Sequence, residues 1–173
     1  MKKIFSITLC LCVLIPASVM AKPRMRLESQ IKLESNHEGE ATLILFDLSP
    51  FISNTCFVEG LKVFNGTKNK ITILWNDAKV NNSKLCFRGD SPSNINSPKS
   101  NENVYSMTGS TSWDVFPAGN ISHYDNSLWP LYNPQTLKKK GGSRSVYITI
   151  PIMFSSEKIE VYKLEVTYQY VSE

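Results

Sequence analysis

The chain has two histidines, the residue type that most often acts as a general base or a metal ligand, and they are considered first. His37 lies in the polar stretch NHEGE, where the glutamates could help to hold a metal, and His123 lies in an aromatic-rich stretch. A catalytic histidine needs a nucleophile within hydrogen-bond distance, and the chain contains no GxSxG, HExxH, P-loop or GxGxxG motif. Turn-forming polar residues explain His37 without a metal. We therefore expect no enzymatic activity, no metal site and no cofactor.

A second candidate is the tripeptide Arg88-Gly89-Asp90, which many animal integrins bind, within the stretch LCFRGDSP. At average residue frequencies it arises by chance in roughly 3% of chains of this length. Gly89, Asp90 and the Ser-Pro pair that follows are typical turn residues, and Cys86 lies just before them. The tripeptide is expected at an exposed turn at the end of a strand, where it is either an integrin ligand or only a turn.

The first residues have the pattern of an export signal. Lys2 and Lys3 precede an apolar run that is followed by a small-residue exit ending at Ala21. We expect residues 1–21 to be a cleaved signal peptide, residues 22–35 an N-terminal strand or donor extension, and residues 36–173 one β-sandwich domain. No later stretch approaches the roughly 18 apolar residues of a transmembrane helix, so no membrane anchor is expected. The predicted location is the bacterial periplasm or cell surface.

Two cysteines, Cys56 and Cys86, remain after the predicted signal peptide. Disulfides form and persist in exported proteins, so we predict that these two cysteines pair. Closing a loop of about 31 residues would stabilise the fold by roughly 3 to 4 kcal/mol in the chain-entropy model. A reactive thiol or a metal-binding pair is the alternative, although the sequence has no CxxC spacing or histidine beside either cysteine.

The charge of the chain is modest, with a formal net value of +4 that falls by two when Lys2 and Lys3 are removed. This charge is too small and too dispersed to predict a nucleic-acid partner. The one basic cluster is the run Lys138, Lys139 and Lys140, which two glycines follow. It reads as a solvated loop tip, or as a contact for an anionic surface.

The secondary structure that positions the candidate residues is predicted to be β-strands. Apolar residues recur at every second position, and helical periodicity is absent. Two segments alternate clearly. The first contains Met25, Leu27, Ser29, Ile31 and Leu33, and the last contains Tyr162, Leu164, Val166, Tyr168 and Tyr170. Shorter strands are predicted at 41–48 (buried on both faces), 56–64, 70–75, 84–87, 104–107, 112–116 and 146–152, with Pro151 at an edge or a bulge. Residues 89–103 and 119–142 are expected to be irregular. This pattern predicts an all-β, immunoglobulin-like β-sandwich, with a closed barrel as the alternative.

Aromatic residues gather in the second irregular region and just before it. The candidates for contact with a glycan or a protein receptor are Trp113, Tyr124, Trp129 and Tyr132. Flat exposed rings suit sugar faces and protein hot spots, and loops on a sandwich often carry binding residues. The alternative is that these rings pack the loop onto the core.

The two ends, MRLESQIKL and YKLEVTYQY, resemble those of subunits of the bacterial chaperone-usher pilus family. The resemblance implies an immunoglobulin-like fold that lacks its last strand and is completed by strand donation. The donor side chains would be Met25, Leu27, Ser29, Ile31 and Leu33. The last strand, beside which a periplasmic chaperone docks, would carry Tyr162, Leu164, Val166, Tyr168 and Tyr170. The implied partners are other pilus-like subunits, a chaperone and an outer-membrane usher, and the implied location is a fimbrium.

Two functions are favoured over a third, a small exported enzyme or an enzyme inhibitor, for which the sequence offers no constellation of residues. The first is an exported structural or adhesive surface subunit that assembles by β-strand donation. The second is a self-contained secreted or periplasmic β-sandwich module that recognises a glycan or a protein receptor. The second hypothesis predicts that the segment 25–33 pairs within its own domain.

Overall fold

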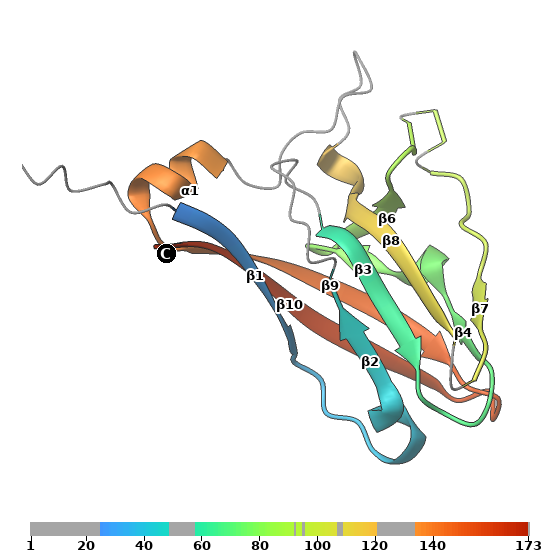
Figure 1. Cartoon of the computed structure of the whole chain (residues 1–173). Helices are drawn as coiled ribbons and strands as arrows, with labels where there is room; N and C mark the ends of the chain where they lie inside the picture. Colours follow the sequence, from blue (N-terminus) through green and yellow to red (C-terminus); the bar gives the residue numbers. More distant parts are fainter. Residues whose placement is uncertain are drawn as a thin grey trace, which may run out of the picture.

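Ten strands make up most of the structure, a computed structural model that describes residues 25–48, 58–91, 93–94, 96–106, 109–120 and 134–172. The strands are β1 (Met25–Leu33), β2 (Ile44–Asp47), β3 (Val58–Asn65), β4 (Ile71–Ile73), β5 (Lys79–Val80), β6 (Ser83–Phe87), β7 (Glu102–Val104), β8 (Ser110–Pro117), β9 (Ser143–Met153) and β10 (Ile159–Ser172). Three single-turn 3-10 helices, η1 (Gly39–Leu43), η2 (Trp75–Asp77) and η3 (Ala118–Asn120), and one α-helix, α1 (Pro134–Lys140), complete the described elements (Figure 1).

The strands form one continuous antiparallel sheet in the order β1-β10-β9-β5-β6-β8-β3-β2, and β4 joins β9 to β7. The sheet folds over on itself so that β2, β3 and β8 pack across from β9 and β10 (Figure 1). Strand β6 belongs to both layers, because it pairs with β5 on one side and β8 on the other. The predicted all-β, sandwich-like fold is confirmed. The strands at the two ends of the order, β1 and β2, do not pair with each other, so the described sheet is barrel-like without being closed.

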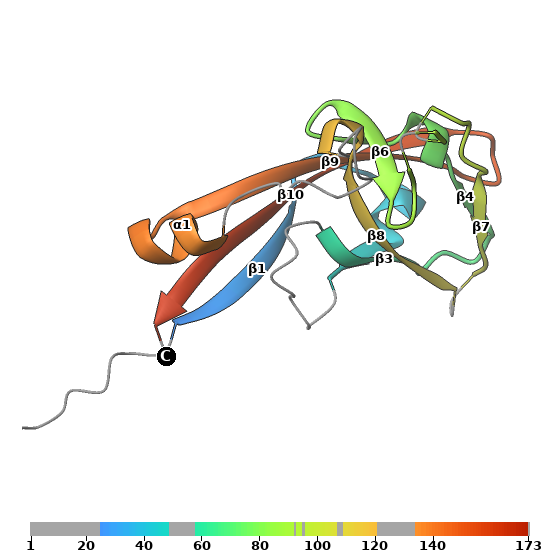
Figure 2. The ribbon, with the colours of Figure 1, turned by 90° about the horizontal axis from the view of Figure 1, so that it is seen from above.

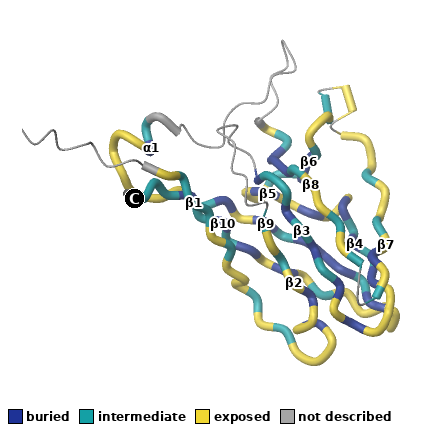
Figure 3. Tube along the Cα trace, viewed as in Figure 1, coloured by how far each residue is buried: buried dark blue, intermediate teal, exposed yellow. Residues whose placement is uncertain are grey.

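The core follows from the alternation of the last two strands. Tyr162, Leu164 and Val166 are directly opposite Ile150, Ile148 and Val146, and all six side chains are buried. Because directly opposite residues of antiparallel strands share a face, this register gathers these six side chains on the inner face. Three other apolar residues of the two strands, Tyr147, Ile159 and Val161, are exposed. The polar residues between them form the outer face, and Figure 3 shows the resulting alternation of buried and exposed positions along β9 and β10.

Pro151 lies inside the sheet, which corrects the prediction of an edge position or a bulge. Strand β9 is paired with β10 on one side, while its other side is shared by β4 and β5, with η2 between them. Pro151 occupies that gap, where its carbonyl accepts a hydrogen bond from the Leu74 N–H at 3.0 Å. Because the N and O atoms of a strand residue point to the same side, the missing N–H of Pro151 also faces the gap and breaks no ladder bond.

Two further predictions about local structure are wrong. Residues 41–48 are not a strand buried on both faces: their first part forms η1, and Leu45 in β2 is 60% exposed. The tight turn of η1 lets the Leu43 carbonyl accept the Gly66 N–H at 3.0 Å. The region 119–142 is not wholly irregular, because α1 begins at Pro134, a residue well suited to the first turn of a helix. Leu137 buries its side chain, and Gly141, at a φ of +69°, ends the helix.

Strand β1, the C-terminal part of β10 and the beginning of β9 extend beyond the second layer as an arm, with α1 beside its end (Figures 1 and 2). Strand β1 pairs with β10 over its whole length, from Met25 opposite Ser172 to Leu33 opposite Leu164. The segment that alternates most clearly in sequence is therefore an edge strand of its own chain.

Candidate functional site

A cavity of about 470 Å³ lies where η2, the end of β6, the start of β7 and the middle of β8 meet the loop that follows β6. We call it the aromatic pocket. Its lining consists of Trp75, Phe87, Asp90, Asn94, Ser97, Pro98, Lys99, Ser100, Asn101, Glu102 and Trp113. This volume is typical of sites that bind small ligands. Apolar rings on one side and short polar side chains on the other make it the best candidate site in the described structure.

Three rings form the apolar side of the pocket. Trp75 is 1% exposed and meets Phe87 edge to face, with ring centroids 5.2 Å apart. Phe87 in turn lies 4.5 Å from Trp113, with 31° between the two ring planes. Trp113 is 38% exposed, so it presents apolar surface to the solvent side of the pocket. The sequence predicted Trp113 as a binding residue, whereas Trp75 and Phe87 were not singled out for binding because each reads as an ordinary strand residue.

Glu102 sets the orientation of both tryptophans. Its Oε2 atom accepts hydrogen bonds from the indole N–H groups of Trp75 and Trp113, each at 2.8 Å, and its Oε1 atom accepts one from the Thr111 hydroxyl at 2.6 Å. An indole has a single N–H donor, so these bonds fix the edge of each ring that faces inward. Glu102 therefore acts as the polar anchor of an otherwise aromatic wall.

The opposite wall is held by an ion pair between Asp90 and Lys99. The side chains of Asp90 and Lys99 are only 17% and 7% exposed, and the ammonium contacts the same carboxylate oxygen that accepts the Phe87 N–H at 2.8 Å. The Lys99 ammonium also lies 4.9 Å from the centroid of the Phe87 ring, a cation–π distance. Together these contacts close the turn after β6 and attach the polar loop to the aromatic wall.

Of the Arg88-Gly89-Asp90 tripeptide, Asp90 lines the pocket, whereas Arg88 and Gly89 do not. Asp90 N–H donates to the Phe87 carbonyl at 2.9 Å, and Gly89 adopts a φ of +102° in the turn. The Arg88 side chain is 60% exposed and lies 3.3 Å from Asp114. Arg88 and Gly89 are exposed, as the sequence predicted for the tripeptide, but the Asp90 carboxylate is already engaged. Integrin binding stays a prediction.

The predicted cysteine pair stays a prediction as well, because Cys56 lies outside the described residues. Within the described residues, Cys86 in β6 has no disulfide partner, and its side chain is fully buried. Burial raises the pKa of the Cys86 thiol to about 11, so that it is protonated at neutral pH. The remaining aromatic candidates, Tyr124, Trp129 and Tyr132, also lie outside the described residues.

The predicted donor strand is β1, and its partner in the structure is β10 of the same chain. Leu27 and Ile31 are half-buried against the core, Ser29 is half-buried, and Leu33 is 43% exposed. On β10, Tyr162, Leu164, Val166 and Tyr168 are buried, and Tyr170 is partly buried. Strand β10 has β1 on one side and β9 on the other, so both of its edges are paired along the arm.

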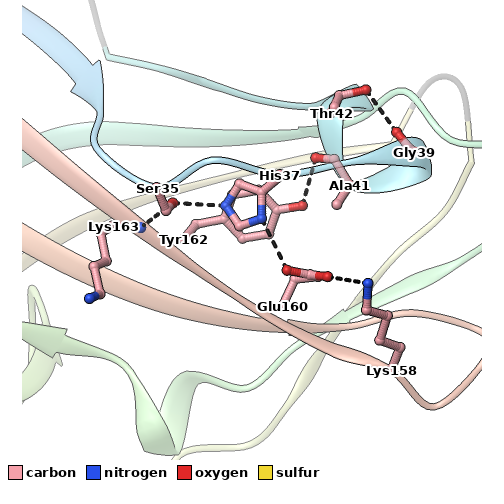
Figure 4. A network of polar contacts seen from close by, with 9 residues as sticks. All are labelled: Ser35, His37, Gly39, Ala41, Thr42, Lys158, Glu160, Tyr162 and Lys163. Carbon is pink, nitrogen blue, oxygen red and sulfur yellow. Dashed lines mark hydrogen bonds and ion pairs between the residues drawn. The ribbon is translucent and has the colours of Figure 1, made fainter.

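A second cluster of polar side chains was not foreseen from the sequence. Ser35 and His37 follow β1, and Glu160 lies near the start of β10 (Figure 4). The Ser35 hydroxyl is 2.8 Å from Nε2 of His37, and Nδ1 of His37 is 3.1 Å from the Glu160 carboxylate. The imidazole also stacks on Tyr162, with ring centroids 4.0 Å apart. The carboxylate at residue 160 is far from His37 in sequence, so only the fold brings them together.

This cluster has the connectivity of a serine–histidine–glutamate relay, but its surroundings are those of a structural clasp. The His37 side chain is only 3% exposed, and the Ser35 hydroxyl accepts the Lys163 N–H at 3.0 Å. Neither residue lines the aromatic pocket or a second cavity, of about 510 Å³, near Tyr147 and Lys163. The cluster therefore ties the segment after β1 to β10.

The hydrogen bonds of this cluster also stabilise the ionised form of Glu160. Hydrogen bonds, first from Lys158 and then from His37, lower the pKa of the Glu160 carboxyl below its ordinary value. Burial raises the pKa of Tyr162, whose hydroxyl donates to the Ala41 carbonyl at 2.8 Å. These contacts join η1, the segment after β1 and the start of β10 into one rigid corner.

Comparisons of the chain with protein-family models, with curated proteins and with solved structures returned no match. Within the described residues, no three side chains of histidine, cysteine, aspartate or glutamate are grouped as metal ligands would be. In the same part of the chain, no helix has the length and apolar character needed to cross a membrane. The resemblance to pilus subunits stays a prediction.

Proposed function

We propose that this protein is an exported, non-enzymatic binding module that holds a glycan in the aromatic pocket. The observation that carries the proposal is the juxtaposition of the half-exposed Trp113 ring with a rim of asparagine and serine side chains around a cavity of about 470 Å³. A sugar ring has an apolar face that stacks on an aromatic ring and hydroxyl groups that hydrogen-bond to amides and hydroxyls.

The charges around the pocket favour an uncharged ligand. Lys99 is the basic side chain of the lining, and it already neutralises Asp90. Glu102 keeps a negative charge that two indole N–H groups and a hydroxyl solvate. An anionic ligand would therefore meet net negative charge in the pocket. Neutral hydroxyl groups, in contrast, could share the rim with the polar loop.

The test is a glycan array probed with the labelled protein, a Trp113→Ala variant and a Tyr105→Ala variant. Tyr105 is the matched control, because it is an aromatic residue that is 68% exposed and does not line the pocket. We expect the protein and the Tyr105→Ala variant to bind the same glycans. The Trp113→Ala variant should bind them about tenfold more weakly or worse, if stacking of a sugar on the ring contributes about as much as stacking of a nucleic-acid base, on the order of 1 to 3 kcal/mol.

Glycan signals that survive in Trp113→Ala would refute the pocket as the site. An array without signals would refute a glycan ligand and leave a protein receptor as the partner for this surface, consistent with the enrichment of tryptophan at protein hot spots. That receptor would be identified by crosslinking at Asn101, a rim residue, with the same two variants as controls.

A second function, assembly by strand donation, is supported by the position of β1. It is an edge strand whose substantial contacts among the described elements are with β10 alone. Among the side chains that the family resemblance assigns to donation, Leu27, Ser29, Ile31 and Leu33 face the same side as the core residues of β10 that lie opposite them. If β1 leaves its own β10 and pairs with the β10 of another subunit, the same ladder forms between chains. The partners would be pilus-like subunits, a chaperone and an usher.

Strand donation predicts assembly that depends on residues 22–34. Deletion of this segment should produce an exported protein that no longer polymerises, and adding a synthetic peptide of the sequence MRLESQIKL should restore a folded monomer. A peptide with Ile31→Asp serves as the control, because it places a charge on the buried face of the ladder. Polymer formation by the deleted protein would refute the idea.

A further inference from the structure

We infer that the end of the arm is a binding surface for an anionic polysaccharide, separate from the aromatic pocket. The surface, called here the basic tip, consists of Lys138, Lys139, Lys140 and Arg144. All four residues are exposed, and none forms an ion pair with a carboxylate of the described residues.

A buried leucine and a two-glycine turn hold these four charged side chains at the end of the arm. Leu137 is 3% exposed and anchors α1 to the arm, so the three lysines that follow it lie at the arm's end. Gly141 and Gly142, at φ values of +69° and +84°, then turn the chain directly into β9. This short connection keeps Arg144 within a few residues of the lysines. Figures 1 and 2 show α1 at the end of the arm, away from the body of the sandwich.

Among the described residues, few carboxylates lie near the basic tip. Within α1, the first residues of β1 and β9, and β10 from Glu165 onward, the described carboxylates are Glu28, which pairs with Arg26, and Glu165, which accepts the Ser145 hydroxyl at 2.6 Å. Helix α1 is also oriented with its C-terminal end toward the lysines, where cations are favourable. The α1 macrodipole partly offsets the repulsion between the three neighbouring lysines. Their exposed ammonium groups remain able to contact a partner.

A hydrated polyanion fits this surface better than a lipid bilayer. Proteins that bind at a membrane surface combine basic residues with large apolar side chains that enter the interface. The exposed large apolar residues of the described structure include Leu45, Tyr105 and Ile159, and none of them belongs to the basic tip. A sulfated or carboxylated polysaccharide needs only charge and hydrogen-bond donors, which four cationic side chains provide.

The experiment measures binding of the full protein to immobilised heparin, to phosphatidylglycerol vesicles and to a single DNA strand at two salt concentrations. Binding to heparin should weaken about 50-fold between 50 and 200 mM salt, if four cations each contribute about as much to the salt dependence as they do on a single nucleic-acid strand. The vesicles and the DNA should bind at least tenfold more weakly than heparin. Tighter binding to either one would overturn the choice of ligand.

Matched variants test the location of the surface. K138Q/K139Q/K140Q should bind heparin about tenfold more weakly or worse, whereas K68Q/K70Q/K79Q should bind as the unchanged protein does. Lys68, Lys70 and Lys79 are all exposed on the body of the sandwich, so the control loses the same charge elsewhere. Equal losses in both variants would show that net charge alone drives binding and would overturn the proposal. Circular dichroism confirms that both variants are folded, and the glycan-array signals of the aromatic pocket should be unchanged in both.

Discussion

Asp90 offers the most informative single substitution, because it links the integrin-like tripeptide to the wall of the aromatic pocket. In Asp90→Asn the side chain still accepts the Phe87 N–H, but the Lys99 ammonium, whose side chain is 7% exposed, loses its countercharge. Breaking a fully buried pair costs about 3 to 5 kcal/mol, and an exposed pair contributes about 0.2 to 1 kcal/mol. The 17% exposure of Asp90 and the long lysine stem, which can turn toward water, place this pair between the two limits. We expect Asp90→Asn to lower the free energy of unfolding by about 1 to 2 kcal/mol.

Urea unfolding, followed by tryptophan fluorescence, measures this change. With an m-value of about 2 kcal/mol per molar, the midpoint should fall by roughly 0.5 to 1 M. Lys99→Met should cost a similar amount, and the double variant should cost less than the sum of the two by about 1 kcal/mol, since removing both partners leaves no unpaired charge. Arg88→Met is the control, because its side chain is 60% exposed, and we expect a change below about 0.5 kcal/mol. Additive effects of the Asp90 and Lys99 substitutions, or an Asp90→Asn effect no larger than that of Arg88→Met, would refute the reasoning.

Three further predictions concern other parts of the fold. Gly66→Ala should destabilise the protein by about 2 kcal/mol or more in the same urea assay, because an added Cβ would lie 2.6 Å from a backbone carbonyl of η1; Gly119→Ala, with open space at the Cβ position, should change little. Cys86 should resist iodoacetamide at pH 8 while the protein is folded, because burial raises its pKa to about 11. If Cys86 pairs with Cys56, counting thiols after unfolding without reductant should find no free thiol. Two free thiols would rule the pairing out. The pKa of Glu160 is lowered in the folded protein, first by the Lys158 hydrogen bond. Its stabilising contribution is therefore present above its unfolded pKa and is lost as pH falls through the folded value. The difference in stability between the protein and Glu160→Gln should be small, and it should shrink from pH 6 to pH 3 rather than grow.

Local patterns in the sequence account for much of the fold. The alternation from Met25 to Leu33 and from Tyr162 to Tyr170 predicted two long strands, and both are present as β1 and β10. The turn after Cys86 was also foreseen from its glycine, aspartate and proline. Period-2 alternation is a property of the strand itself, so it is visible wherever one face of the strand is buried.

Predictions failed where the structure depends on neighbours that the local sequence does not specify. Leu45 lies in an apolar stretch, yet it is 60% exposed because it lies on the outer face of β2, while its neighbour Ile44 faces the core. Pro151 is tolerated inside the sheet only because β4 and β5 leave a gap beside it. Helix α1 is a single short element, and Leu137 is its one apolar residue among those whose burial is described, so no helical periodicity could be detected.

For the candidate site as well, the sequence predicted a single residue, and the remaining contacts depend on the fold. Trp113 was predicted to bind a ligand because of its type, but the pocket also needs Trp75, Phe87 and Glu102 from three other elements. The clasp between His37 and Glu160 joins residues 123 positions apart. Side-chain contacts across such distances depend on which strands become neighbours and in which register.

By itself, the sequence determined which residues of β1 and β10 face the core, that the chain turns after Cys86 and that its architecture is all β. The tertiary structure alone decided that β1 pairs with its own β10, that Asp90 of the integrin-like tripeptide holds Lys99, and that the lysines of α1 lie at the end of the arm. The physical reason is that backbone hydrogen bonds between strands are the same for every residue type. Alternation therefore selects the buried face of a strand, while the choice of partner is made by the packing of the whole core.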